Sequence, residues 1–307
     1  MIYTCTFTPS IDYTTYLAEF EAGRLNRAED VYYYPGGKGI NVSRVLNRLD
    51  TDSVALGFAG GFTGEYLKQF LNNEGIQTEF TDTGENTRIN VKIKAKNETE
   101  LNGPSPEIQN HQLDSLLEKV TMMKEDDWFV LAGSLPSSIP ADFYEKLTNA
   151  CRKKGVRFVL DTSGPALGSL LSTNPFLIKP NSEELGDLFG TSITSKRQAA
   201  HYAKKLVDDG ITYVIVSMGG EGAILVSKEG TWTAESPRGK AVNTVGAGDS
   251  MVAGFLASFQ KNGNAEEAFR FGVACGSATA FQSDLCQKED AQKLLGQVTT
   301  KFIRNRM

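Results

Sequence analysis

The residues best suited to chemistry lie in the stretch NTVGAGDSMVAG. Gly246, Ala247 and Gly248 come directly before Asp249, and the residues that follow predict a helix. The first turn of a helix exposes unpaired N–H donors and the positive end of the helix dipole, and small residues let an anion approach those donors. A carboxylate beside them can take a proton from a hydroxyl group. The stretch therefore predicts phosphoryl transfer to an alcohol, with the small residues as an anion hole and Asp249 as the base; the alternative is that Asp249 only caps the helix.

A second glycine-rich helix start, PGGKGIN, lies early in the chain. Its backbone donors, together with Lys38 and Asn41, are suited to holding hydroxyl groups or a phosphate, although an ordinary glycine turn before an amphipathic helix is the alternative. Asp12 lies in TPSID, after the first predicted strand, where open α/β sheets have their ligand crevice. It either accepts hydrogen bonds from sugar hydroxyls or forms a turn with its own backbone.

Two polar pairs add to these candidates. Arg88 and Asn90 share a face of the predicted strand RINVKIKAK and suit a phosphate plus a hydroxyl, unless the arginine only solubilises an edge strand. Asn181 and Glu184, in KPNSEEL, are three residues apart at a predicted helix start and therefore share a face. They either orient Mg²⁺ through water molecules or form a capping box.

Composition argues against several classes of protein. The formal net charge of −5 provides no overall basic field for nucleic acid or an anionic membrane. No apolar run approaches the roughly 18 residues of a transmembrane helix, and MIYTCTF lacks the features of a signal peptide, so we expect a cytoplasmic protein. The 4 cysteines are scattered and only 2 histidines are present, so neither a zinc site, a disulfide framework nor His-based catalysis is expected.

The elements that must position these residues follow from the hydrophobic pattern. Short apolar runs alternate with segments of helical period, as in SVALGF followed by GEYLKQFLNN, and this predicts an α/β fold with a mainly parallel sheet covered by helices. Residues 13–34 and 88–96 break the alternation and predict a small separate sheet. With no linker or repeat in the sequence, we expect a single domain over residues 1–307.

The known nucleotide fingerprints do not fit. GGKGIN lacks the GK[ST] of a P-loop, and neither GAGDSM nor GGEG completes GxGxxG, so a Walker-type NTPase and a Rossmann dehydrogenase are not supported. A sugar-phosphate-binding regulator remains the non-enzymatic alternative. An aspartate at position 249 behind an intact GAG argues against it.

Five motifs, GGKGINVSRVL, AGSLPSS, KPNSEEL, VSMGGEG and NTVGAGDSMVAG, occur in an order that resembles the ribokinase-like (PfkB) sugar kinases over essentially the whole chain. The resemblance implies an ATP-dependent, magnesium-using kinase with a doubly wound α/β domain and a small β-sheet lid that closes over the sugar. Residues 13–34 and 88–96 would form that lid.

The resemblance also assigns roles to individual residues. Asp249 matches the base, and Gly246, Ala247 and Gly248 match the anion hole. Asn243 stands where the family's DTxGAGD motif begins with Asp, so the monovalent-cation dependence of some members is not carried over. The remaining matches are sugar contacts at Asp12, Gly37, Lys38 and Asn41, the magnesium-associated pair Asn181 and Glu184, and a nucleotide pocket at Lys179, Asn181, Ser217, Gly219, Gly222, Gly246 and Gly248.

Within the family, TPSID, TRINVKI and TVGAGDSMVAG are most similar to the members that convert fructose 1-phosphate into fructose 1,6-bisphosphate, with tagatose-6-phosphate kinases as the second choice. Lid pairing between two chains is usual in these kinases, so the resemblance implies a homodimer. It assigns the existing phosphate and its neighbouring hydroxyls to Lys38, Arg88, Asn90 and Ser134, with Arg27 reaching in from a partner's lid.

Overall fold

The central element of the fold is a large sheet. The computed structural model describes residues 1–136 and 138–304. The strands of the large sheet are β1 (Ile2–Thr6), β4 (Ser53–Ala59), β5 (Gln77–Thr78), β6 (Thr81–Asp82), β9 (Trp128–Ala132), β10 (Arg157–Asp161), β11 (Leu177–Ile178), β12 (Tyr213–Ser217), β13 (Ala223–Val226), β14 (Gly230–Ala234) and β15 (Thr300–Arg304).

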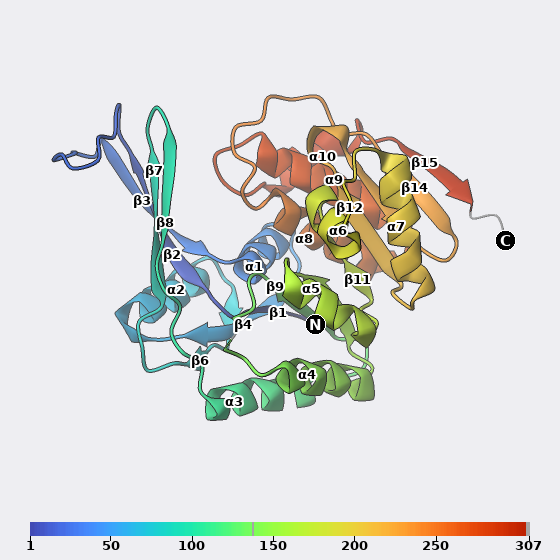
Figure 1. Cartoon of the computed structure of the whole chain (residues 1–307), viewed down its shortest axis with the longest axis horizontal. Helices are drawn as coiled ribbons and strands as arrows, with labels where there is room; N and C mark the ends of the chain where they lie inside the picture. Colours follow the sequence, from blue (N-terminus) through green and yellow to red (C-terminus); the bar gives the residue numbers. More distant parts are fainter. Residues whose placement is uncertain (137, 305–307) are drawn as a thin grey trace.

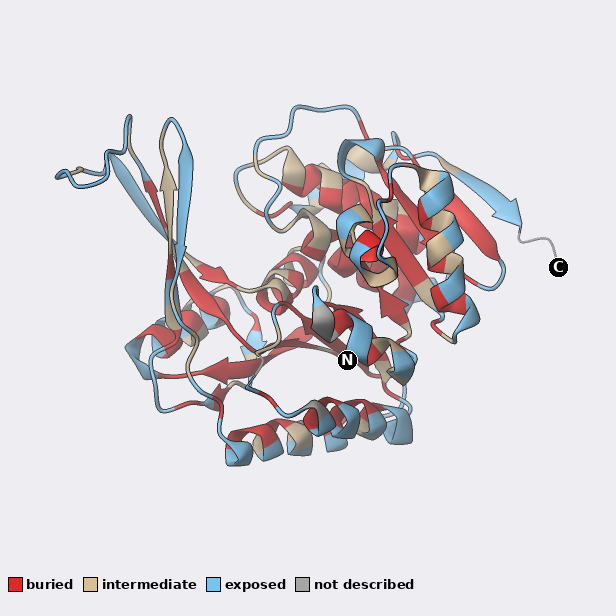
Figure 2. Cartoon of the chain, in the orientation of Figure 1, coloured by how far each residue is buried: buried red, intermediate tan, exposed pale blue. Residues whose placement is uncertain are grey.

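The strand order is β15-β14-β13-β12-β11-β10-β9-β1-β4-β5, with β6 beside β4. Pairing is parallel from β12 through to β5 and antiparallel from β12 to β15. The parallel strands are buried on both faces, which explains why they read as nearly continuous apolar runs (Figure 2).

Helices cover both faces of this sheet (Figure 1). One apolar core joins a sheet face to α3–α7, and two others join the opposite face to α1, α2 and α8–α10. Residues along one strand alternate between these cores, as Phe129 and Val130 do. The helices are α1 (Lys38–Arg48), α2 (Gly61–Asn73), α3 (Asn110–Thr121), α4 (Ala141–Lys154), α5 (Pro165–Leu170), α6 (Ser182–Phe189), α7 (Lys196–Asp208), α8 (Ala247–Asn262), α9 (Ala265–Ala280) and α10 (Lys288–Leu295), with 3₁₀ turns at Leu171–Thr173 and Gly219–Glu221.

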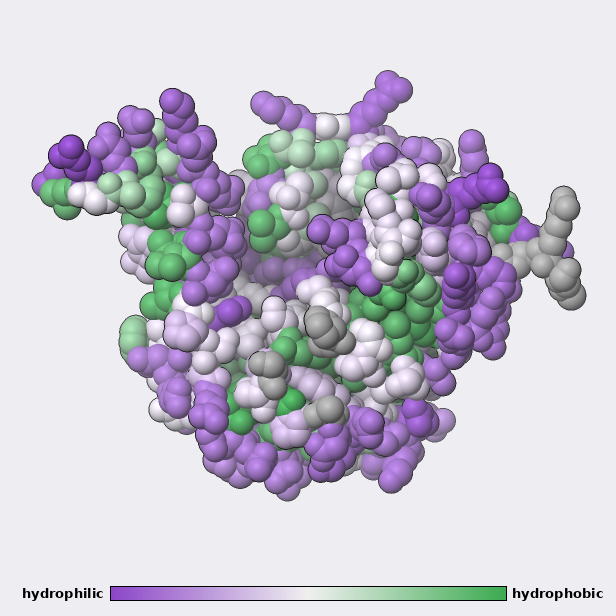
Figure 3. Space-filling model, viewed as in Figure 1, coloured by the Kyte–Doolittle hydropathy of each residue, from purple (hydrophilic) through white to green (hydrophobic). Residues whose placement is uncertain are grey.

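A second, smaller sheet projects from the body as an arm (Figure 1). Its strands are β2 (Ser10–Tyr16), β3 (Asp30–Gly36), β7 (Arg88–Lys94) and β8 (Glu98–Asn102), in the order β3-β2-β7-β8. The central pair, β2 and β7, is parallel, and the outer pairs are antiparallel. The space-filling view shows the surface hollowed between this arm and the body (Figure 3).

The predicted α/β fold with a mainly parallel sheet and a separate small sheet is confirmed. Two features were not predicted. β8 has the sequence ETELN, in which Leu101 is the only apolar residue, so pairing with β7 rather than its own pattern makes it a strand. The antiparallel strands β13–β15 extend the edge of the large sheet. None of the helices in the described part of the chain is long and apolar enough to cross a membrane.

Candidate active site

Asp249 lies in the first turn of α8 and is only 4% exposed. Gly246 caps this helix with a φ of 80°, a left-handed conformation that favours glycine. Asn41, on α1, donates a hydrogen bond from Nδ2 to Asp249 Oδ2 at 2.8 Å. Burial and the nearby charge of Asp161 raise the pKa of Asp249 to about 6, against the opposing effects of Lys38, Asn41 and Lys179. The carboxyl group is thus held in place with a pKa suited to a base near neutral pH.

A second buried carboxylate, Asp161, lies at the end of β10 and is 1% exposed. Its Oδ1 is 3.3 Å from Lys38 Nζ and 3.4 Å from Lys179 Nζ. Although burial raises the pKa of Asp161, the two lysines lower it overall. Asp161 therefore pairs with both Lys38, which is predicted to contact the sugar, and Lys179, which is predicted to contact the nucleotide.

Asp161 is not among the site residues that the sequence motifs predicted. The available signal was an aspartate at the carboxyl end of the strand RFVLD, which is where α/β sheets bind ligands. Lys179 passes so close to α8 that a Cβ on Gly248 would lie 2.8 Å from its Nζ. The small residue at position 248 thus keeps the lysine beside the helix start.

Asp12 lies on β2, among donors of the small sheet. Its Oδ1 accepts hydrogen bonds from Ser10 Oγ at 2.8 Å and Asn90 Nδ2 at 3.0 Å, and its Oδ2 is 2.9 Å from Lys92 Nζ. A Cβ on Gly36 would lie 2.5 Å from Asp12 Oδ1, so the glycine lets β3 pass the carboxylate. Lys92 was also missed; the alternation of RINVKIK puts it on the same face as Asn90.

Arg88 and Asn90 both have buried polar atoms that lack a partner within the described residues. Arg88 donates from Nη2 to the carbonyl of Thr8 at 3.1 Å, while its Nε has none, and neither has Asn90 Oδ1. Such atoms are costly unless a ligand or water satisfies them. Ser134 lies in the loop after β9, where its carbonyl is 3.5 Å from Thr8 Oγ1.

Arg27 is not brought to this group of residues. It is exposed in the loop between β2 and β3, where it borders a separate shallow pocket with Glu19 and Arg24. The predicted contact of Arg27 with the sugar phosphate therefore requires the site of a second chain.

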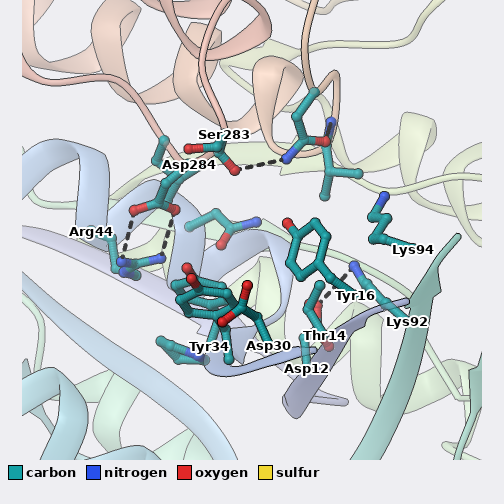
Figure 4. Close-up of a pocket in the computed structure, with 16 residues that line it drawn as sticks. Asp12, Thr14, Tyr16, Asp30, Tyr34, Arg44, Lys92, Lys94, Ser283 and Asp284 are labelled. Carbon is teal, nitrogen blue, oxygen red and sulfur yellow. Dashed lines mark hydrogen bonds and ion pairs between the residues drawn. The ribbon is translucent and has the colours of Figure 1, made fainter. Parts of the chain in front are cut away.

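Two cavities lie next to this group of residues: one is bordered by Gly248, the neighbour of Asp249, and the other by Asn41. A cavity of about 640 Å³ is bordered by most of the predicted nucleotide residues, which lie on the loops and helices at the carboxyl end of the sheet: Asn181, Ser217, Gly219, Gly222 and Gly248. Ala247, of the predicted anion hole, also borders it. A second cavity of about 390 Å³ lies beneath the small sheet and is bordered by Asp12, Asn41 and Lys92 (Figure 4).

Asn181 and Glu184 form a capping box at the start of α6. Asn181 Oδ1 accepts from the Glu184 N–H at 2.8 Å, and the Asn181 N–H donates to Glu184 Oε2 at 2.8 Å. The capping alternative is therefore observed, and it leaves a metal role open because Asn181 also borders the larger cavity. No cluster of three or more His, Cys, Asp or Glu side chains with metal-site geometry occurs in residues 1–136 and 138–304.

Comparison with known proteins agrees with this architecture. The pfkB family carbohydrate kinase profile matches residues 6–291. The chain belongs to this family, and is thus an enzyme that transfers a phosphoryl group to a carbohydrate, with ATP implied as the donor. The resemblance found in the motifs is confirmed.

Two relatives and one solved structure are similar to most of the chain. The 1-phosphofructokinase of Bacillus subtilis (strain 168) is 52% identical over 97% of this chain and 98% of its own. The D-tagatose-1-phosphate kinase of Bacillus licheniformis is 36% identical over 93% of this chain and 94% of its own. The crystal structure of phosphofructokinase-2 from Escherichia coli in complex with fructose-6-phosphate has a TM-score of 0.90, with 32% identity over 96% of this chain and 98% of that one.

Proposed function

We propose that the chain transfers the γ-phosphoryl group of ATP to the C6 hydroxyl of fructose 1-phosphate, which yields fructose 1,6-bisphosphate and ADP. The observation that carries this proposal is the buried Asp249 at the N-terminus of α8, fixed by Asn41 and raised in pKa to about 6. The choice of sugar is supported by the name of the Bacillus subtilis relative at 52% identity.

In the proposed reaction, Asp249 accepts the proton of the C6 hydroxyl. The hydroxyl oxygen attacks the γ-phosphorus, a new O–P bond forms, and the bond between the γ-phosphorus and the β,γ-bridging oxygen breaks so that ADP leaves with that electron pair. At pH 7 a carboxyl group with a pKa of about 6 is mostly ionised, yet it is more basic than an ordinary aspartate. Both properties favour general-base catalysis.

Residues 246–248 would form the anion hole for the charge that develops on the transferred group. The Ala247 N–H donates to the Thr244 carbonyl at 3.2 Å. We therefore assign the principal role to the N–H of Gly248, which lies in the first turn of α8 and borders the larger cavity. Lys179, beside Gly248, would add a positive charge at the same place.

ATP would occupy the larger cavity and contact Ser217, Gly219 and Gly222. Mg²⁺ would be held through water molecules by Asn181 and Glu184, and it would neutralise phosphate charge. The donor set fits this ion, because Mg²⁺ takes few carboxylates and keeps several waters. Burial alone would lower the pKa of Lys38, but Asp161, Asp249 and Glu184 raise it, so Glu184 lies within electrostatic range of Lys38.

The existing phosphate would bind to Lys38, Arg88, Asn90 and Ser134. Arg88 Nε and Asn90 Oδ1 lack partners within the described residues, so a bound sugar phosphate would satisfy polar atoms whose burial otherwise costs free energy. Ring hydroxyls would contact Asp12 and Asn41, which are partly buried, and a wrong stereocentre would lose these hydrogen bonds. This is the proposed source of sugar specificity.

The second candidate substrate is tagatose 1-phosphate, because a relative at 36% identity is named D-tagatose-1-phosphate kinase. Tagatose 6-phosphate, suggested by the motifs, is retained in the test. ADP release is measured with fructose 1-phosphate, tagatose 1-phosphate, fructose 6-phosphate, tagatose 6-phosphate and fructose. We expect kcat/KM for fructose 1-phosphate to exceed the others by at least about tenfold, or ~1.4 kcal/mol. Preference for any other sugar overturns the proposed substrate.

We also propose a homodimer in the cytoplasm, in which the small sheets of two chains pair. One face of the sheet lines the smaller cavity with polar residues, whereas the other exposes apolar side chains, among them Ile89 (42% exposed), Tyr33 (51%) and Leu101 (67%). A partner sheet would cover them and bring Arg27 to the neighbouring site. The 4 cysteines are free and buried, as expected in a reducing compartment.

A further inference from the structure

A cluster of four charged side chains lies beside the smaller cavity, which two of them, Arg44 and Asp284, border directly. Arg44 and Arg48 extend from α1, and Glu74 and Asp284 lie opposite them. Arg44 makes a two-point contact with Glu74 at 2.8 and 2.9 Å, while Arg48 Nη2 is 2.7 Å from Asp284 Oδ2. Arg44 Nη2 lies farther from Asp284 Oδ2, at 3.4 Å. Figure 4 marks the contact between Arg44 and Asp284 with dashed lines. The charges of the cluster balance, with Arg48 as the closest partner of Asp284.

Asp284 belongs to a short segment that is attached at several points. Arg48 Nη1 donates to the carbonyl of Leu285, and Asn243 Nδ2 donates to the carbonyl of Ser283 at 3.2 Å. Burial would raise the pKa of Asp284, but Arg44, Arg48 and the Leu285 N–H hold it below the usual value, so the carboxylate stays ionised and paired. The segment is therefore fixed to α1 on one side and to the loop before α8 on the other.

The contact between Leu285 and Gly246 extends this attachment to the start of α8. A Cβ on Gly246 would lie 2.5 Å from Leu285 Cδ2, so the leucine packs directly against the residue that caps α8. Gly246 precedes the Gly248 N–H and Asp249. A shift of Leu285 would therefore change the direction of the first helical turn.

Helix α1 consequently holds the N-terminus of α8 at two places. Asn41 bonds Asp249 directly, and two turns later Arg48 holds Asp284, whose neighbour Leu285 packs on Gly246. We propose that Asp284 is a positioning residue for phosphoryl transfer, because it joins the sugar-binding helix to the anion hole. This inference rests on the proposed function, which assigns the anion hole to residues 246–248. Asp284 itself touches neither reacting group.

The test is Asp284→Asn, which keeps the side-chain size and removes the charge that Arg48 binds. Because a misplacement of about 1 Å can cost on the order of 10²-fold in rate, we expect kcat to fall about 10- to 100-fold. The KM values for ATP and sugar phosphate should stay within about threefold of the parent values, since the binding residues are retained. Leu285→Ala keeps the ion pairs, removes the contact with Gly246, and should show the same loss in kcat.

The matched control is Asp126→Asn. Asp126 also pairs with an arginine, Arg157, at 2.6 Å, but it lies before β9 at the opposite end of the sheet from the site. The kcat of Asp126→Asn should remain within about twofold of the parent value, because Asp126 lies far from the reacting groups and shares no partner with them within the described residues. Thermal unfolding of all three variants shows that the measured protein is folded at the assay temperature.

The results separate this inference from the proposed function. If Asp249→Asn abolishes turnover while folded Asp284→Asn keeps the parent kcat, or raises KM at unchanged kcat, only the role of Asp284 is overturned. An equal loss in Asp126→Asn overturns it as well. If Asp249→Asn keeps near-normal kcat, the proposed function itself is wrong. Should Asp284→Asn not fold, parent-like kcat in Leu285→Ala overturns the inference.

Discussion

At the scale of single residues, the site contains two buried carboxylates, and each is stabilised by different partners. Asp161 is fully enclosed and is stabilised by Lys38 and Lys179, whereas Asp249 is enclosed with an amide, Asn41, as its direct partner. Two carboxylates in one site therefore differ in pKa: that of Asp161 is lowered, and that of Asp249 is raised to about 6. Divergence of this kind is typical of groups that have different roles in catalysis.

The role of Asp249 predicts a pH dependence. Protonation removes the base, so kcat should fall about tenfold per pH unit below the pKa of about 6 and level off above it. Asp249→Asn should lose about 10²- to 10⁴-fold in kcat while both substrates still bind. Steady-state kinetics from pH 5 to 9, with binding measured by calorimetry, check both results. A kcat close to that of the parent would exclude Asp249 as the base.

The same substitution should not destabilise the protein. A raised pKa means that the folded state holds the proton more tightly than the unfolded chain, so ionisation of Asp249 costs stability as pH rises through about 6. Asparagine has no charge to bury. At pH 8 the thermal midpoint of Asp249→Asn should therefore equal or exceed the parent value. A clear decrease would show that the ionised carboxylate stabilises the fold.

At the scale of elements, α6 shows how one pair of residues can serve two purposes. The capping box of Asn181 and Glu184 begins the helix, and the same side chains are proposed to hold water-bound Mg²⁺. Glutamine can replace glutamate at the third position of a capping box, but it carries no charge. The two roles can therefore be tested separately.

Glu184→Gln should keep the thermal midpoint close to the parent value, because the hydrogen bond to the Asn181 N–H is retained. The Mg²⁺ concentration needed for half-maximal rate should rise several-fold, since the carboxylate that attracts the ion is gone. Magnesium titrations at saturating ATP and sugar measure this shift. An unchanged magnesium requirement would leave Glu184 with capping alone.

The arm formed by β2, β3, β7 and β8 is proposed to close as a lid over the sugar. Closure excludes water, which protects the phosphoryl donor from hydrolysis. Hydrogen exchange in residues 13–34 and 88–96 should slow when sugar phosphate is added. Helix α7, which packs on the face of the large sheet opposite α1 and α8, is the internal control. Equal exchange with and without saturating sugar phosphate would contradict the lid.

At the scale of the whole molecule, the arm exposes an apolar face that a single chain leaves in water. Burial of such side chains favours association by roughly 25 cal/mol per Å². We expect Ile89→Lys, which introduces a charge on this face, to convert the proposed dimer into monomers and to lower activity if Arg27 acts across the interface. Met122, an apolar residue that is 81% exposed on the body, provides the control Met122→Lys. Sedimentation measures the oligomeric state of each protein. A monomeric parent, or an Ile89→Lys variant that is still dimeric, would show that the proposed interface is wrong.

The sequence by itself determined the local features of this protein. The small residues before Asp249, the glycine-rich start at Lys38 and the NxxE spacing act within one helical turn, so their geometry follows from neighbours in the chain. The apolar runs that alternate with helical segments likewise determined the α/β class, because parallel strands are joined by a crossover that is usually a helix. The five ordered motifs determined the family.

Only the tertiary structure decided which of these features meet. Asn41 and Asp249 are 208 positions apart, and Lys38 and Asp161 are 123 apart, so no local pattern pairs them. Asp161, Lys92 and Asp284 were missed because a charged residue at a strand end, on a strand or in a loop is usually solvated. Their partners in the structure identify them. Those partners meet because the sheet order brings β1, β9 and β10 side by side, and because α1 packs against α8.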